Sequence, residues 1–186
     1  MSYKYLTSTI FLLLSLETVQ AQSKYGYADH SIRELKQFEY YRGVWVSELE
    51  MRQEDGSFKK IEGGAQVTGR FLDDHRTFQS QFTTPNGFFS TDIRTYNTTT
   101  KQWEALFLNA KAQRWHQFTS KIIAGKMTTI VKGGYSGKEE FDIKVIDSII
   151  DDNNYQKDVY KSTDGMKTWI LTYKIDLSKL LTEPGE

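Results

Sequence analysis

The stretch SIRELKQFEYYRGVW, residues 31–45, decides the fold, because a short helix ends in it and a β-sheet begins. Ser31 and Glu34 have the spacing of a capping box, in which a hydroxyl and a carboxylate satisfy free backbone amides of the first helical turn. Apolar residues then recur at every third position: Ile32, Leu35, Phe38 and Tyr41. This stripe predicts a helix that packs one face against a core and ends at Gly43.

From Trp45 onward, apolar and polar residues alternate with a period of two, which is typical of half-buried β-strands. Some ten such segments run to Ile175, separated by turn sequences such as Asp55-Gly56 and Gly133-Gly134. The paired glycines at 63–64 predict a bulge or sharp bend inside the second segment. The connections are too short for helical crossovers, so neighbouring strands must be antiparallel. We therefore expect an all-β protein, an antiparallel up-and-down closed barrel of about ten strands, with one short N-terminal helix covering one end.

The first 21 residues have the three parts of a secretory signal peptide: a short polar start with Lys4, an apolar stretch, and small residues before a cleavage site at Gln22. The alternative is a retained membrane anchor, which needs about 20 apolar residues, more than this stretch offers. We expect residues 1–21 to be removed, residues 22–30 to form a flexible leader, residues 31–177 to form one barrel domain, and residues 178–186 to form a tail. Export would place the protein in a bacterial periplasm or outside the cell.

The chain has 186 residues, no cysteine, and 24 basic against 24 acidic residues. Without net charge there is no global field to attract polyanions, so nucleic acid is not an expected partner. None of the histidines, His30, His75 and His116, has a second ligand at a metal-binding spacing, so we predict no metal and no cofactor. Asp147 and the pair Asp151-Asp152 lack the spacing of a calcium loop and are expected to be solvated. No membrane association is expected after signal cleavage, and the sequence leaves the oligomeric state open.

Several segments resemble known β-barrel proteins. Gly43-Val44-Trp45 resembles the Gly-x-Trp start of lipocalin-like (calycin) barrels. Three further segments resemble an uncharacterised bacterial family of exported calycin-like proteins: Glu62-Gly63-Gly64-Ala65, Thr95-Tyr96-Asn97 before Trp103, and residues 162–169, Ser-Thr-Asp-Gly-Met-Lys-Thr-Trp. The resemblance implies a barrel in which Trp45 packs at the closed end against a basic residue of the last strand, for which Lys174 is the nearest match.

The alternation anchored at Trp45 predicts an inward face that is mainly apolar and aromatic, typical of a ligand cavity with a few polar groups and equally typical of a filled core. Arg76 shares the parity of Phe78 and Phe82 and is expected to be an inward cation. The candidate ligand-binding residues are Arg76, Phe78, Phe82, Trp103, Phe107, Arg114, His116 and Phe118.

The segment Arg114-Trp115-His116-Gln117-Phe118 presents two faces, and parity alone leaves open which one is inside. If Arg114, His116 and Phe118 point inward, a cation and a titratable imidazole face the ligand, which would then be anionic or carry a carbonyl group. If Trp115 points inward, Arg114 and His116 are surface residues.

Three functions follow from these features. The leading hypothesis is an exported, non-catalytic carrier or sensor that holds a small, partly hydrophobic molecule in the barrel. The alternative is a barrel enzyme, an isomerase, lyase or hydrolase, in which His116 is the catalytic acid or base and Arg114 or Arg76 binds an anionic group. A third possibility is an interaction module of the cell envelope that binds a partner on the outer surface of the sheet.

Overall fold

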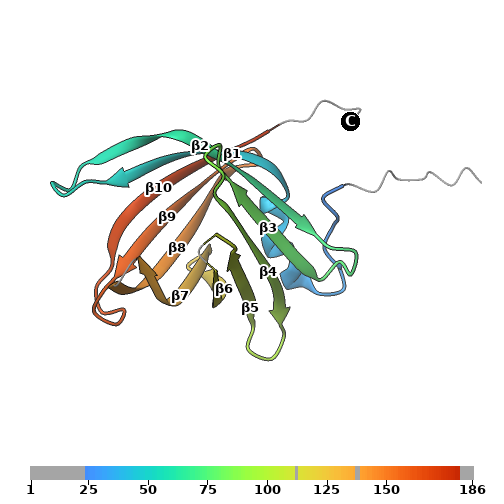
Figure 1. Ribbon diagram of the computed structural model, residues 1–186. Helices are drawn as coiled ribbons and strands as arrows, with labels where there is room; N and C mark the ends of the chain where they lie inside the picture. Colours follow the sequence, from blue (N-terminus) through green and yellow to red (C-terminus); the bar gives the residue numbers. More distant parts are fainter. Residues whose placement is uncertain (1–23, 112, 137–138, 181–186) are drawn as a thin grey trace, which may run out of the picture.

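The computed structural model describes residues 24–111, 113–136 and 139–180, so the predicted signal peptide lies outside the described residues. All-β architecture is confirmed: ten strands close into one barrel in the order β1-β10-β9-β8-β7-β6-β5-β4-β3-β2, and every neighbouring pair is antiparallel (Figure 1). The elements are η1 (Arg33–Tyr41), β1 (Gly43–Arg52), β2 (Phe58–Phe71), β3 (Thr77–Thr83), β4 (Phe89–Asn97), β5 (Gln102–Asn109), β6 (Arg114–Ile123), β7 (Lys126–Ser136), β8 (Glu139–Asp151), β9 (Asn154–Ser162) and β10 (Ile170–Lys179).

The N-terminal helix η1 is a 3₁₀-helix of nine residues rather than an α-helix. A 3₁₀-helix has three residues per turn, so side chains at every third position stay on one line, and Leu35, Phe38 and Tyr41 are all buried. The predicted capping box does not form: the N-cap is Ile32 and has no side-chain cap, and the Ser31 amide instead donates to Asp29. The period of three therefore predicted the buried face correctly. The capping box predicted from the Ser-x-x-Glu spacing was wrong.

The core lies at the end of the barrel that η1 covers. The Trp45 indole donates to the backbone oxygen of Tyr41 at 3.1 Å, which ties the first strand to the end of the helix. The basic residue over this indole is Lys179, whose Nζ lies 5.5 Å from the Trp45 ring centroid and which pairs with Trp45 across β1 and β10. The expected partner, Lys174, lies over Phe58 instead. That assignment was wrong because β10 continues past Ile175 to Lys179.

Two glycine pairs, 63–64 and 133–134, lie at register shifts within strands. At 63–64 the β1–β2 register shifts, as predicted, and a Cβ on Gly64 would lie 2.5 Å from the Ser47 oxygen. The pair at 133–134 does not form the expected turn, because β7 runs through it to Ser136 with a register shift after Val131. Both pairs are therefore bulges within strands, a feature that bends a sheet toward closure.

The segment before η1 is packed rather than free from Tyr25 onward. The Tyr25 oxygen accepts a hydrogen bond from the Phe71 amide, and Ala28 is completely buried. The Asp29 amide donates to the His75 oxygen, and the His75 ring stacks on Tyr27 with centroids 4.1 Å apart. The part of the expected leader that the structure describes is thus attached to the β2–β3 connection. Within the described residues, no helix is long and apolar enough to cross a bilayer.

Candidate functional site

A cavity of about 360 Å³ lies within the barrel between β5 and β9. Ten of the described residues line it: Phe107, Asn109, Arg114, His116, Phe118, Val131, Phe141, Ile143, Val145 and Val159. β5 runs from Gln102 to Asn109, and its second residue, Trp103, is fully buried beside η1. Asn109 and Arg114 flank the β5–β6 connection, so the polar end of the cavity lies opposite the end covered by η1.

The orientation of β6 is now decided. Arg114, His116 and Phe118 line the cavity, whereas Trp115 is 65% exposed on the outer face. His116 pairs with Phe107 across the two strands, and their ring centroids lie 6.2 Å apart. The alternation along 114–118 therefore places a guanidinium and an imidazole on the lumen side, two residues apart on one strand.

The walls below these polar groups are almost entirely apolar. Three phenylalanines and four β-branched residues contribute them: Phe107, Phe118, Phe141, Val131, Ile143, Val145 and Val159. The β-branched residues come from neighbouring strands β7, β8 and β9, where the registers Val131↔Ile143 and Val145↔Val159 hold them side by side. Their branched side chains pack well on a pleated surface, so the wall is made of ordinary strand-forming residues.

A buried guanidinium separates the cavity from the core. Arg94 of β4 donates from Nε to Asp92 at 2.8 Å and forms an ion pair with that carboxylate, which also accepts from the Ser80 hydroxyl. The Arg94 guanidinium lies 4.5 Å from the Phe38 ring of η1 and 5.4 Å from the ring of Phe118. One side chain thus connects the covering helix to the cavity wall.

A second interior ion pair joins β8 and β9, which pair at Asp147 and Lys157. Asp147 accepts from Lys157 at 2.7 Å and from the Tyr40 hydroxyl at 2.6 Å. Burial, followed by the negative charge of Asp147, raises the pKa of Tyr40 well above 10, so Tyr40 remains a neutral donor. Asp147 is therefore a buried anchor for η1, and its expected role in a solvated turn was wrong. Among the described residues, no group of three or more histidine, cysteine or acidic side chains is placed to hold a metal ion.

The electrostatics of the cavity favour neutral imidazole beside a permanent positive charge. Burial, together with the neighbouring Arg114, lowers the pKa of His116 below its ordinary value of 6.5. None of the ten lining residues is acidic. At neutral pH the described part of the lining therefore presents one guanidinium, one neutral imidazole and one amide among apolar side chains.

The predicted site residues fall into three groups. Phe107, Arg114, His116 and Phe118 meet in the cavity. Phe78 and Trp103 belong to the core and Phe82 packs at its edge, so the structure assigns these three to packing. Arg76 does not point inward: it precedes β3 and forms an exposed ion pair with Asp29 at 2.9 Å.

Sequence reasoning missed part of the site. Asn109 lies two residues after Phe107 on the same strand, so the alternation of β5 could have predicted that it faces the cavity. Val131 and Val159 lie beside bulged registers, where parity counted from a distant residue fails. Arg94 and Lys157 gave no sequence signal as interior residues, because charged side chains are seldom buried unless they are paired.

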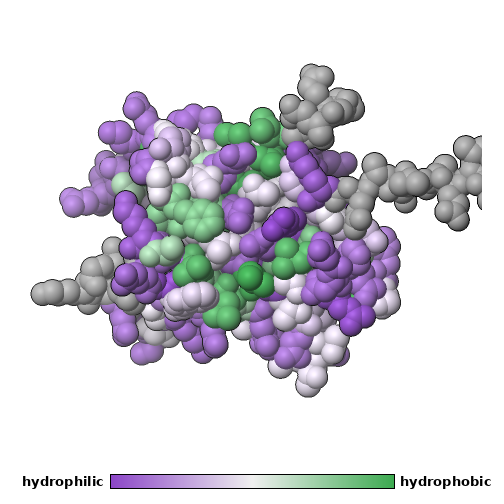
Figure 2. All heavy atoms as spheres, turned by 45° about the vertical axis from the view of Figure 1, so that its right-hand side comes forward, coloured by the Kyte–Doolittle hydropathy of each residue, from purple (hydrophilic) through white to green (hydrophobic). Residues whose placement is uncertain are grey.

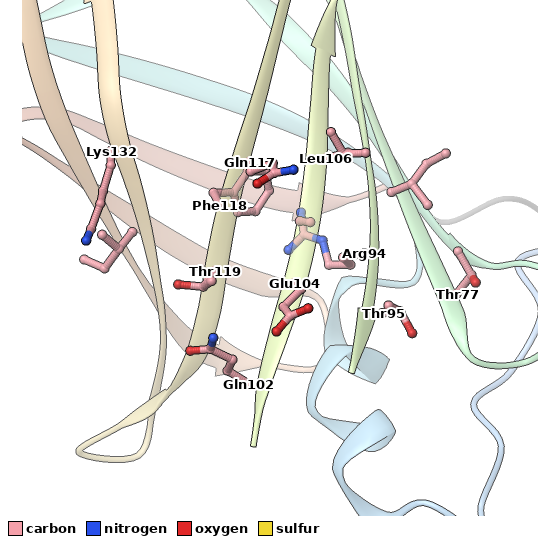
Figure 3. A pocket seen from close by; sticks show the side chains of 13 residues that line it. Thr77, Arg94, Thr95, Gln102, Glu104, Leu106, Gln117, Phe118, Thr119 and Lys132 are labelled. Carbon is pink, nitrogen blue, oxygen red and sulfur yellow. The ribbon is translucent and has the colours of Figure 1, made fainter. Parts of the chain in front are cut away.

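A larger groove of about 860 Å³ crosses the outer face of β4, β5 and β6 (Figure 3). One bank carries the cross-strand neighbours Ile93, Leu106 and Gln117, and the other carries Thr95, Glu104 and Thr119. It is a channel between two rows of surface side chains. On the face shown in Figure 2, apolar side chains lie in small groups separated by hydrophilic ones. The lumen cavity, where apolar walls enclose a few polar groups, is the better candidate for ligand binding.

The comparisons with known proteins agree with this architecture. No protein-family model and no curated protein matches the sequence. Among solved structures, the S-type phycobiliprotein lyase CPES from Guillardia theta is similar, with a TM-score of 0.55 at 7% identity over 80% of this chain and 93% of that chain. Rv2717c from M. tuberculosis matches with a TM-score of 0.49 at 10% identity over 81% of this chain and 99% of that chain. Identity this low indicates fold and not activity. The chain has the lipocalin-like barrel fold that its Gly-x-Trp start predicted.

Proposed function

We propose that this protein is an exported carrier or sensor that binds a small, partly hydrophobic molecule in the lumen cavity. The observation that carries the proposal is the cavity itself: about 360 Å³, walled by phenylalanine, valine and isoleucine, with its polar groups at one end. Ligand pockets range from about 300 to 1,000 Å³ and combine apolar walls with a few placed polar groups. A similar barrel in a protein that is named a phycobiliprotein lyase supports the use of such a lumen for a small molecule.

Filling the cavity tests this proposal. Val145 lines the cavity, and the next residue on β8, Ile146, has the opposite parity and provides a matched control. We expect Val145→Phe to weaken binding of the neutral fluorescent probe N-phenylnaphthylamine by at least about tenfold, because the added ring occupies the space that the probe needs. Ile146→Phe should leave binding unchanged. Binding is measured by fluorescence titration. Equal affinity of both variants and the unaltered protein would show that the probe binds elsewhere, and the lumen would be rejected as the binding site.

Export is the second part of the proposal and rests on residues 1–21, with their polar, apolar and small-residue parts. Expression of the full chain in a Gram-negative bacterium, followed by fractionation and mass spectrometry, tests it. We expect a periplasmic protein whose first residue is Gln22. An intact chain that remains in the cytoplasm would show that the segment is not a signal.

One observation favours an enzyme as a second candidate function. His116 faces the cavity, and its lowered pKa leaves it able to accept a proton at neutral pH, while Arg114 on the same face can hold an anionic group. Incubation of each binding compound with the protein, followed by mass spectrometry, would reveal turnover. An enzyme requires that His116→Asn abolish this turnover, whereas a carrier returns every bound compound unchanged.

A further inference from the structure

We infer that the cavity selects an amphipathic monoanion, whose anionic head lies beside Arg114 and His116 and whose apolar body packs against the walls below. This inference rests on the proposed function and names the ligand class of the same site. It follows from the charges of the lining, the position of the polar groups and the volume available.

The charge argument starts from what faces the lumen. The lining holds the Arg114 guanidinium and the His116 imidazole, and none of the ten lining residues that the structure describes is acidic. Lys161 adds a further cation at the wall, with its Nζ 4.7 Å from the ring centroid of Phe141. An anionic ligand would meet favourable potential here, and a cationic ligand would meet repulsion in a place where water screens poorly.

Among the side chains that the structure describes, two inward-facing carboxylates lie near the cavity, and both are already neutralised. Asp92 is held by Arg94, and Asp147 by Lys157 and Tyr40. These pairs lie beneath the apolar walls, between the cavity and the core, so their charges balance one another rather than the charge of Arg114. The positive character of the polar end is therefore not offset by the acids of this layer.

The shape argument sets the orientation of the ligand. Arg114 belongs to the first residues of β6, at the barrel end away from η1, and the apolar residues extend from it along β6, β7 and β8. A guanidinium recognises a carboxylate through two parallel hydrogen bonds, which fixes the head group. Three phenylalanines in the wall suit an aromatic body, and the volume of about 360 Å³ limits the ligand to one or two rings with a short linker.

A head-group series on one body tests the inference. Phenylbutanoate, phenylbutanol and phenylbutylamine share the same apolar part and differ in charge, and each is competed against the neutral probe N-phenylnaphthylamine. We expect the carboxylate to bind at least about tenfold more tightly than the alcohol, as a charge-assisted hydrogen bond in an apolar site allows, and the amine to bind most weakly. An alcohol that binds as tightly as the carboxylate would overturn the inference.

Arg114→Gln should remove the preference for the carboxylate over the alcohol. Lys121→Gln removes the same charge from an exposed position on β6 and should preserve the preference. Loss of the preference in both variants would show a general effect of net charge and overturn the inference. Probe binding confirms that each variant is folded.

The two proposals fail in different ways. If Val145→Phe leaves probe binding unchanged, the proposed lumen site is wrong. If Val145→Phe weakens probe binding but the carboxylate is not preferred, only the inferred ligand class is wrong.

Discussion

Arg94 and Lys157 are charged side chains that the barrel keeps in its interior. Each is ion-paired, Arg94 with Asp92 and Lys157 with Asp147, and each also lies over aromatic rings, those of Phe38 and Tyr41 in η1. An interior charge is tolerated only when it is paired and hydrogen-bonded, and both residues meet that condition. These two cations join the helix to strands far away in the sequence, and they form a polar layer between the packed core and the cavity.

Another residue-scale feature is the backbone of the β9–β10 turn. Asp164 accepts hydrogen bonds from the Ser162 hydroxyl and from the amides of Lys167 and Thr168, and bonding to Thr168 lowers the pKa of Asp164 to about 2. The turn requires a φ of +67° at Met166, a conformation that side chains with a Cβ adopt at a cost. The hydrogen bonds to the Asp164 carboxylate therefore stabilise the turn despite the strain at Met166. Because the pKa of Asp164 is lowered, this stabilisation is present above pH 4 and is lost as the carboxylate is protonated toward pH 2.

Met166→Gly should stabilise the protein. Glycine adopts positive φ without the Cβ penalty, and after its larger unfolded-state entropy is deducted we expect a gain of about 0.5–1 kcal/mol in the free energy of unfolding. Urea denaturation measures this change. Met166→Ala keeps the Cβ and should give no gain, so an equal stabilisation by both variants would mean that removal of the side chain, and not relief of the backbone, is responsible.

At the scale of elements, η1 acts as the cover of the barrel. Phe38 packs against Phe78 with ring centroids 5.2 Å apart and against Trp103 at 4.7 Å, and it is almost completely buried. We expect Phe38→Ala to lower the free energy of unfolding by about 3–5 kcal/mol, because it leaves a cavity where the helix meets three strands. Lys36→Ala, on the exposed side of η1, should change it by less than about 0.5 kcal/mol. Similar losses from both variants, measured by denaturant unfolding, would contradict the role of η1 as a packed cover.

The sequence predicted these elements well where a local pattern decides them. A period of three in η1 and a period of two in the strands both follow from which side chains face the core, and the Gly63-Gly64 bulge follows from a close backbone approach. The capping box failed because the Ser31 amide found a partner in Asp29, outside the helix. The turn predicted at Gly133-Gly134 failed because the same glycines also suit a bulge. Local sequence does not distinguish such alternatives.

At the scale of the molecule, closure of the sheet settles what the sequence left open. Parity alone could not decide whether Trp115 or His116 points inward. In the closed barrel, the registers of the ten strands relate every inner position to Trp45 and so settle the orientation. The inward orientation expected for Arg76 was wrong because that residue lies before β3, where alternation does not apply, and it pairs with Asp29. The interior ion pairs could not be predicted: Asp92 and Arg94 are two residues apart and Asp147 and Lys157 lie on adjacent strands, a spacing equally typical of surface pairs.

Barrel closure also gives a prediction for the whole molecule. The β1–β10 pairing has seven pairs, and four of them lie beyond Ile175: Asp176, Leu177, Ser178 and Lys179 pair with Glu48, Ser47, Val46 and Trp45. A chain that ends at Ile175 loses these pairs together with buried Leu177, and leaves an unpaired β1 edge that promotes association between chains. We expect this chain to lose its cooperative thermal transition and to aggregate, as shown by circular dichroism and size-exclusion chromatography. A chain that ends at Leu180 keeps all of β10 and should melt as the full chain does. If the shorter chain melted at the same temperature as the longer one, closure through the last four pairs would not be what holds the barrel together.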